Sequence, residues 1–386
     1  MHVSHKSACI FLSALLLIAL FFTIGSCFID EEYLSVTENR LPTAFPSCSL
    51  HSLLYGESGE RMDGFIGDRF PFRERLLSLK QHVDRLFTGE SDGVLFTSDG
   101  YLVNRCKDTS TSTELLQRNL DALSALKEEL TRRGIPTTIA LAPRTIDVVH
   151  ASLPKAFTDS HKARYNTANT AIIDLAPILR RLHGEGKTVM YRTDHHWTTL
   201  GVYYAYTEIC PSLGITPYPL TEFQCITVKS DFIGTTQALA GCLISEIELP
   251  DTIALYRYNG DDRFTVTIHD TGETRTGLYC EEYLHTKDAY RVFLGGNFGH
   301  VSVEFDDRDS SPRPRLLLFK DSFALSLLPF LARHYDVDLI DPRYDAEAAL
   351  SALLKEQQFD SALILLGRDT CATSAAIHRW CRRALA

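Results

Sequence analysis

The chain has 386 residues, of which 45% are hydrophobic and 23% charged, and its formal net charge at pH 7 is -10. This composition excludes wholesale disorder, and the length accommodates one large α/β domain with extensions or two modest domains. The acidic residues are scattered, which argues against a nucleic-acid groove and against a polybasic membrane surface, since both need clustered Lys or Arg.

The first 27 residues differ from the rest. Ala8 to Ile24 carry no charge, and Gly25-Ser26-Cys27 follow directly. Small residues before a Cys at the end of an apolar run are typical of a lipoprotein processing site, so Cys27 is a lipidation candidate. An uncleaved signal anchor fits equally well, and a buried core helix is the third interpretation. The first two predict an extracytoplasmic chain tethered to the cell membrane.

We expect three parts: the leader or anchor over 1–27, an extension with one helix over 28–111, and an α/β domain over 112–386. In the extension, apolar residues at helical spacing predict a helix over Arg73–Phe87. Residues Gly93–Leu102 are expected to form short strands joined by a Ser-Asp-Gly turn.

Beyond residue 112, short apolar strands alternate with helices. The predicted strands are Thr137–Leu141, Thr188–Tyr191, Arg315–Phe319, Val337–Ile340 and Ser361–Leu366. The predicted helices are Leu115–Arg133, 163–183 (with 171–175 as an alternative strand), Thr198–Ile209, Phe323–His334 and 345–357. This alternation predicts a mostly parallel sheet covered on both faces, in a three-layer α/β/α arrangement. Residues 215–290 break the rhythm with Asn-Gly and Thr-Gly turns and are expected to form a β-rich insertion.

A loop expected between a strand and a helix contains Asp194-His195-His196-Trp197. Asp194 and His196 are two residues apart, so an extended backbone points both side chains the same way. A carboxylate beside an imidazole can fix its tautomer and stabilise its protonated form. The triplet Asp194, His195 and His196 could instead ligate a metal, or the segment could simply cap the following helix.

Ser322 follows the apolar strand Leu316–Phe319 at the entrance to the next helix. A hydroxyl there can face a site at the strand ends, and the helix N-terminus offers backbone N–H groups to an oxyanion. This is the logic of a nucleophile elbow, although the GxSxG pattern is absent. The alternative is an ordinary helix N-cap.

Taken together, several segments in this order resemble the DHHW family of bacterial exported proteins, which is similar to the SGNH-like domain of periplasmic alginate O-acetyltransferases. The matching segments are Glu38-Asn39-Arg40, Phe70–Arg73, Thr193–Gly201, Phe232–Thr235, Leu294–Asn297, Lys320–Phe323 and Asp341–Tyr344. The resemblance implies an SGNH-like fold. One departure is the block Lys320-Asp321-Ser322, where common SGNH esterases have Gly-Asp-Ser.

The resemblance implies that Ser322 is the nucleophile, with His196 as general base and Asp194 as the orienting carboxylate. It also makes Asn297 the candidate oxyanion donor, with Gly296 allowing close backbone approach. We interpret His195 and Trp197 as supporting or packing residues. Arg343 could bind an anionic group on a glycan or form a structural ion pair.

The function implied is extracytoplasmic transfer of an acyl group, expected to be acetyl, to a cell-wall or secreted polysaccharide. A membrane partner would carry the acyl group across the bilayer, and neither cofactor nor metal is expected. The open alternatives are a carbohydrate O-acetyl esterase, a non-catalytic tethered scaffold that binds glycan, and a metallohydrolase. The last lacks an apparent third or fourth ligand motif.

Overall fold

The computed structural model describes residues 5–26, 43–45, 57–70, 72–105, 110–149, 152–153, 172–240, 249–306, 312–344 and 346–385. The lipidation candidate Cys27 and the first part of the helix predicted over 163–183 lie outside these ranges. The chain divides into two compact units, one formed by residues 1–92 with 237–247 and the other by residues 93–236 with 248–386.

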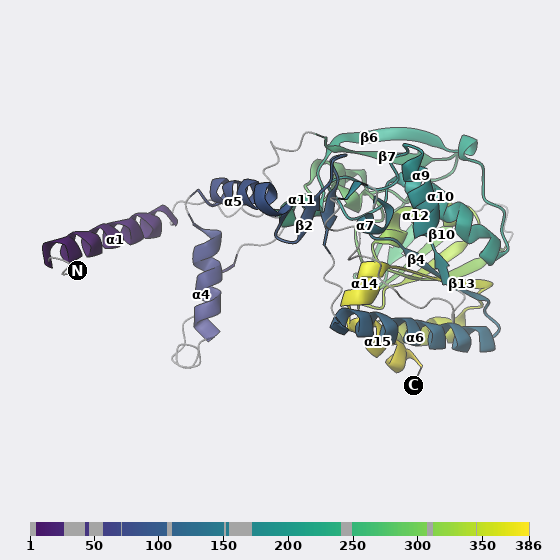
Figure 1. Ribbon diagram of the computed structural model, residues 1–386. Coiled ribbons are helices and arrows are strands. Elements are labelled where there is room, and N and C mark those ends of the chain that lie inside the picture. Colours follow the sequence, from purple (N-terminus) through teal and green to yellow (C-terminus); the bar gives the residue numbers. More distant parts are fainter. Residues whose placement is uncertain are drawn as a thin grey trace. The chain divides into compact units, whose positions relative to one another are not determined.

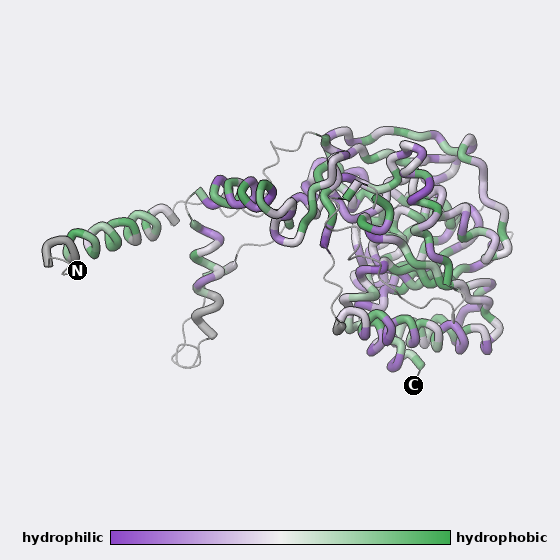
Figure 2. The backbone as a smooth tube through the Cα atoms, viewed as in Figure 1, coloured by the Kyte–Doolittle hydropathy of each residue, from purple (hydrophilic) through white to green (hydrophobic). Residues whose placement is uncertain are grey.

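The first unit is mainly helical where it is described. Its helices are α1 (His5–Ser26), α4 (Glu57–Asp68) and α5 (Arg73–Thr88), and α5 confirms the helix predicted over 73–87. Helix α1 is hydrophobic along much of its length (Figure 2), and its large side chains, such as Phe11 and Leu17, are exposed. Among the residues whose side chains the structure describes, no helix offers a stretch both long enough and apolar enough to cross a membrane.

The second unit holds the main sheet and its covering helices (Figure 1). Its longer helices are α6 (Ser110–Arg132), α9 (Ala176–Gly184), α10 (Thr199–Ile209), α12 (Phe323–Leu331), α13 (Glu347–Glu356) and α15 (Ala376–Ala384). The shorter ones are α7 (Thr145–Val148), α14 (Arg368–Thr373) and α11 (Thr235–Ala240), the last of which crosses the boundary at residue 237.

In the described part of the chain the main sheet has eight strands, in the order β5-β4-β13-β11-β12-β10-β8-β9. The strands are β4 (Thr137–Ala142), β5 (Ile172–Asp174), β8 (Phe264–Ile268), β9 (Glu273–Thr276), β10 (His300–Phe305), β11 (Arg315–Lys320), β12 (Asp336–Ile340) and β13 (Ser361–Gly367). The pairs from β5 to β12 are parallel, and those from β12 to β9 are antiparallel. The predicted mostly parallel α/β sheet is therefore confirmed.

Successive side chains of β11 explain the three layers. Leu316 and Leu318 belong to the hydrophobic cluster shared with α9, α10 and α12, whereas Leu317 and Phe319 belong to the cluster shared with α6, α13 and α15. Because strand residues alternate between faces, a run of apolar residues buries both sides of the strand. Each fully buried side chain of this kind contributes roughly 2 kcal/mol relative to exposure. Figure 1 shows α6 and α15 on one side of β4 and β13, with α9, α10 and α12 on the other.

The strand predicted over Thr188–Tyr191 is wrong. Met190 forms only an isolated antiparallel bridge with Trp197, and the Tyr191 N–H donates to His196 O at 3.0 Å. The segment therefore closes a loop upon itself instead of joining the sheet. Its apolar residues are buried in the core without a strand partner, and periodicity alone does not distinguish the two cases.

Before α9, the alternative strand interpretation is confirmed, because β5 occupies 172–174 and α9 begins only at Ala176. Within 215–290, the described residues form β6 (Gln224–Phe232) and β7 (Asp251–Arg257), an antiparallel pair separate from the main sheet. The later strands of that segment, β8 and β9, extend the main sheet itself. Near the unit boundary lie β1 (Glu90–Ser91) and the antiparallel strands β2 (Val94–Phe96) and β3 (Leu102–Asn104).

Candidate active site

The fold brings Asp194, His196 and Ser322 into one hydrogen-bonded chain. His196 Nδ1 lies 2.6 Å from Asp194 Oδ1, and His196 Nε2 lies 2.8 Å from Ser322 Oγ. With Nδ1 donating to the carboxylate, Nε2 carries a lone pair and can accept the hydroxyl proton. The three side chains predicted from the sequence are thus arranged as nucleophile, base and orienting carboxylate would be.

Asp194 is fixed on its second oxygen by the segment that follows β6. Its Oδ2 accepts hydrogen bonds from Thr235 N at 2.9 Å and from Thr235 Oγ1 at 3.0 Å. The adjacent Gly234 packs so tightly that a Cβ there would lie 2.2 Å from Asp194 Cβ. A residue without a side chain is therefore required at position 234.

The backbone before Asp194 is held by a second buried carboxylate. Asp251, at the start of β7, accepts from Arg192 N, Thr193 N and Thr193 Oγ1, each at 2.7 Å. The Thr193 hydroxyl also accepts from Gly234 N at 2.9 Å. These bonds fix the loop at Arg192 and Thr193, directly before Asp194.

Ser322 stands at the N-cap position, directly before the first residue of α12, yet its side chain does not cap the helix. Its side chain makes no cap hydrogen bond, and Asp321 Oδ1 instead accepts from Phe323 N at 3.0 Å. Asp321 Oδ2 accepts from Gly367 N at 2.6 Å, which ties the turn to the end of β13. The capping role is thus taken by Asp321, and the Ser322 hydroxyl remains directed to His196.

Burial and charge set the protonation states of the pair. Burial is the largest influence on His196 and, together with His195, lowers its pKa to about 4, although Asp194 acts in the opposite direction. For Asp194, burial alone would raise the pKa, but the two histidines and the hydrogen bonds from His196 and Thr235 bring it below its usual value. At neutral pH the pair is therefore a carboxylate and a neutral imidazole, as a general base requires.

Tyr290, which the sequence analysis did not single out, lies against the imidazole. Its ring stacks on His196 with centroids 3.9 Å apart and planes 10° from parallel. Its hydroxyl lies 3.0 Å from Ser326 Oγ. Burial raises the pKa of Tyr290 well above its usual value, so the ring stays neutral. Tyr290 thus limits ring rotation of His196 without adding a charge beside it.

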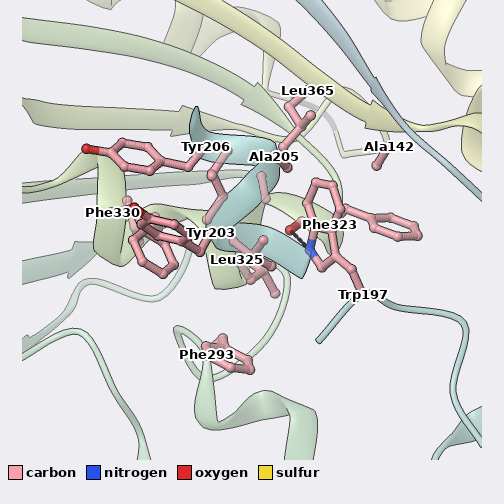
Figure 3. Packing of buried hydrophobic residues seen from close by; sticks show 14 of the residues in the cluster. Ala142, Trp197, Tyr203, Ala205, Tyr206, Phe293, Phe323, Leu325, Phe330 and Leu365 are labelled. Atoms are coloured by element: carbon pink, nitrogen blue, oxygen red, sulfur yellow. Dashed lines mark hydrogen bonds between the residues drawn. The ribbon is translucent and has the colours of Figure 1, made fainter. Parts of the chain in front are cut away.

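Trp197 is a packing residue with a polar anchor. Its indole Nε1 donates to Phe323 O at 3.1 Å and to Ser326 Oγ at 3.0 Å. Figure 3 shows its indole beside Phe323, and the two rings meet edge to face with centroids 5.4 Å apart. Because Phe323 follows Ser322 directly, Trp197 joins the histidine loop to the serine helix.

His195 is the most accessible member of the tetrad, with a side chain 38% exposed. Its Nδ1 lies 3.0 Å from Thr235 Oγ1. Ligand atoms of Asp194, His195 and His196 all lie within 4.8 Å of one another, so the three could hold a metal ion. Asp194 and His196, however, already use their facing atoms in the chain to Ser322, and a fourth ligand is not found among the described residues.

The remaining predicted residues form a second polar cluster. Asn297 Oδ1 accepts from Lys320 Nζ at 2.9 Å, and Gly296 has a φ of 130° that only glycine adopts readily. The Arg343 guanidinium donates twice to Asp341, at 2.9 Å and 2.6 Å. Arg343 is therefore engaged in the ion pair that was the alternative to glycan binding, and its side chain is 28% exposed.

A cavity of about 230 Å³ is lined, among others, by Tyr191, Arg192 and Thr199, which flank the tetrad in the sequence, and by Asp251. Neither His196 nor Ser322 lines it. Chemistry at Ser322 therefore does not take place inside this cavity.

Sequence reasoning missed Thr235, Asp251, Tyr290 and Lys320. Each contacts its partner in or beside the candidate site across 23 to 94 positions of the chain, so local sequence patterns do not reveal the contact. Thr235 and Lys320 did have a signal, since the segments Phe232–Thr235 and Lys320–Phe323 were among the family-like motifs, but neither residue was given a role.

Residues 156–340 match the DHHW protein family. The chain is also 25% identical over 161 residues to the "Probable alginate O-acetylase AlgJ" of Pseudomonas putida, a match that covers 39% of this chain and 42% of that protein. This chain therefore spans less than half the length of that relative.

Solved structures with the same fold include a DHHW family protein from Eubacterium siraeum, with a TM-score of 0.59, 20% identity, and coverage of 75% of this chain and 95% of that one. Bacillus cereus PatB1 with a sulfonyl adduct has a TM-score of 0.55, 15% identity, and coverage of 74% of this chain and 99% of that one. The match to the DHHW family thus covers slightly less than half of the chain and includes the tetrad Asp194–Trp197, while the α/β fold is shared with these two solved structures.

Proposed function

We propose that this chain is an extracytoplasmic O-acyltransferase of the SGNH type that transfers an acyl group, expected to be acetyl, to a hydroxyl of a cell-wall or secreted polysaccharide. The observation that carries the proposal is the chain of hydrogen bonds from Asp194 through His196 to Ser322. A scaffold that only binds glycan has no need of a serine 2.8 Å from a neutral, carboxylate-paired imidazole.

In the proposed reaction, Ser322 Oγ attacks the carbonyl carbon of the acyl donor while His196 Nε2 takes the hydroxyl proton. The tetrahedral intermediate collapses as the proton passes from His196 to the leaving oxygen, which produces an acyl-Ser322. An acceptor hydroxyl then loses its proton to His196 and attacks the acyl carbon. The proton returns to Ser322 Oγ as the new ester leaves.

The oxyanion of each intermediate would be held by the Ser322 N–H at the start of α12 and by Asn297 Nδ2. Donors placed in advance at a developing negative charge supply a large part of such catalysis, with about 10²–10³ in rate for a single donor. Gly296, next to Asn297, would let the acyl group approach the backbone.

The acceptor class rests on the similarity to a protein named as a probable alginate O-acetylase. The cellular location rests on the uncharged segment Ala8–Ile24, which we propose serves as a membrane anchor or lipoprotein leader ahead of an extracytoplasmic domain. Because acetyl-CoA is not available outside the cell, a membrane partner would have to deliver the acyl group to Ser322.

An esterase that uses water as acceptor would need the same three residues. The test is hydrolysis of an aryl acetate by the full chain, with and without oligosaccharide acceptors, beside Ser322→Ala and His196→Ala. The matched controls are Ser351→Ala on α13 and His285→Ala, both at exposed positions. Loss of activity only in the first two variants, with acetyl-oligosaccharide as product, supports the transferase.

Two other outcomes would contradict the proposal that the chain is a transferase. Acetate released at an unchanged rate whatever the acceptor would favour the esterase. Equal turnover in all five proteins would overturn triad chemistry altogether.

A further inference from the structure

Lys320 is a charged side chain in an apolar strand. It ends β11, two residues before Ser322, and its side chain is completely buried. Nζ donates to Asn297 Oδ1 at 2.9 Å and to Asp341 Oδ2 at 3.2 Å. Burying a lysine is unfavourable unless it is paired and hydrogen-bonded, so a buried lysine this close to the candidate nucleophile calls for a role.

Asp341 holds the ammonium in place from the neighbouring strand. It follows β12 directly, is itself fully buried, and accepts from Arg343 on both oxygens. Burial lowers the pKa of Lys320, while Asp341 and Asp321 act to raise it. The Lys320 side chain is thus fixed at its end by a carboxylate that is in turn fixed by Arg343.

The contact with Lys320 determines how the Asn297 amide is oriented. A lysine ammonium has three donors and no acceptor, so it can face only the oxygen of a side-chain amide. The flipped amide would place its NH₂ group against the ammonium and lose the hydrogen bond. With Oδ1 occupied, Nδ2 is the free end of the amide, and it donates to no group in the described part of the chain.

We propose that Lys320 is a positioning residue that locks the Asn297 amide so that Nδ2 serves as an oxyanion donor for Ser322. This inference rests on the proposed acyl-transfer function and deepens it. It also explains the departure from Gly-Asp-Ser: the residue two before the nucleophile carries a side chain because that side chain orders the donor.

The test compares Lys320→Met with Asn297→Asp, and Lys187→Met, on a partly exposed lysine outside the candidate site, is the matched control. Asn297→Asp keeps an oxygen for Lys320 but removes the donor, so the fold should be retained. For each protein we would measure kcat and KM for an aryl acetate, the Ki of an alkyl boronic acid that forms a tetrahedral adduct with the serine, and Tm.

We expect kcat to fall about 10²-fold in Lys320→Met and at least as far in Asn297→Asp, which is the effect of losing one oxyanion donor. The boronate Ki should rise in parallel while KM and the pH profile stay the same. A merely structural lysine would lower Tm without this selective loss of tetrahedral-adduct affinity. Lys187→Met should match the wild type.

The double variant Lys320→Met/Asn297→Ala distinguishes action through Asn297 from an independent effect. It should be no slower than Asn297→Ala alone, because the lysine acts only through the amide. Wild-type kcat and boronate affinity in Asn297→Asp would overturn the proposal, as would additive losses in the double variant. If Lys320→Met does not fold, the kcat and boronate affinity of Asn297→Asp still test whether Asn297 acts as an oxyanion donor.

A failure of the proposed acyl-transfer function would give a different result from a failure of the proposed role of Lys320. Wild type and Ser322→Ala would then hydrolyse the ester equally, whatever residue 320 is. The wild-type comparison is therefore made before any Lys320 variant is interpreted.

Discussion

His196 Nε2 lies 2.8 Å from Ser322 Oγ, although 126 positions separate the two residues in the chain. Ser322 follows the parallel strand β11, whereas His196 lies in a loop held by hydrogen bonds within itself, by Leu102 N, which donates to Arg192 O, and by Asp251 and Thr235. The contact between His196 and Ser322 therefore depends on two parts of the fold that are held in place separately.

Asp194→Asn should leave the loop in place but lower kcat for ester hydrolysis by about 10³–10⁴-fold. The amide cannot stabilise the imidazolium formed in the transition state, and it favours the wrong tautomer of His196. Steady-state kinetics on an aryl acetate would check this, with Asp360→Asn as the matched control in a turn before β13. A loss below about tenfold would mean that Asp194 does not orient a general base.

Gly234→Ala should lower both kcat and the stability of the fold, although residue 234 is not one of the three proposed catalytic residues. The new Cβ would lie 2.2 Å from Asp194 Cβ, so Asp194 or the backbone must move. Displacement of about 1 Å can cost about 10²-fold in rate, and overpacking of this kind costs about 1–3 kcal/mol of stability.

The matched control is Gly184→Ala at the end of α9, where a Cβ meets no atom within 4 Å. Both kcat and Tm of Gly184→Ala should stay at wild-type values. A Gly234→Ala variant with full activity would show that Asp194 tolerates the shift and is not held in a required position.

The rate should depend on pH through His196, whose pKa burial lowers from 6.5 to about 4. The base is competent when neutral, so kcat/KM should be flat above about pH 6 and fall tenfold per unit below pH 4. A pH profile with an acid limb near 6.5 would contradict this environment for His196.

The free energy of unfolding should also depend on pH through His196. Between pH 6.5 and about 4 the unfolded chain binds a proton at His196 that the folded chain does not, so the free energy of unfolding falls as the pH is lowered through this window. Denaturant titrations of wild type and His196→Ala should show a smaller pH dependence in the variant.

Removal of metal ions separates the triad from the metallohydrolase interpretation. Asp194, His195 and His196 are close enough to hold an ion, but in the triad mechanism no step uses one. Prolonged treatment with a chelator should leave ester hydrolysis unchanged, and His195→Ala should retain most of it. Activity lost to the chelator and restored by zinc would favour the metal site.

Much of this architecture could be predicted because it rests on local chemistry. The apolar run Leu316–Phe319 predicted a strand buried on both faces, and Ser322, three residues after it, was therefore expected at the carboxyl end of the sheet. Asp194 and His196 were recognisable as a pair because their spacing is short. Their joint role was inferred from the resemblance, since no single motif was decisive.

What could not be predicted depends on packing between distant segments. Thr188–Tyr191 has the composition of a strand but is buried as a loop, because its backbone hydrogen bonds go to His196 and Thr198 within the same loop, and Asp251 holds the next two residues. Tyr290 became a neighbour of His196 only through the fold. A lysine after four apolar residues looks like the polar end of a strand, and its burial against Asn297 became visible only in the structure.

The central claim is that Ser322 is a nucleophile activated by His196, and covalent labelling tests it most directly. The full chain would be treated with a sulfonyl fluoride and the modified peptide identified by mass spectrometry, in wild type, Ser322→Ala, His196→Ala and the control Ser351→Ala. The account predicts a single sulfonyl adduct on Ser322 in wild type and in the control, with labelling slowed by several orders of magnitude in His196→Ala and absent in Ser322→Ala. An adduct on another residue, or labelling of Ser322 at the same rate without His196, would contradict it.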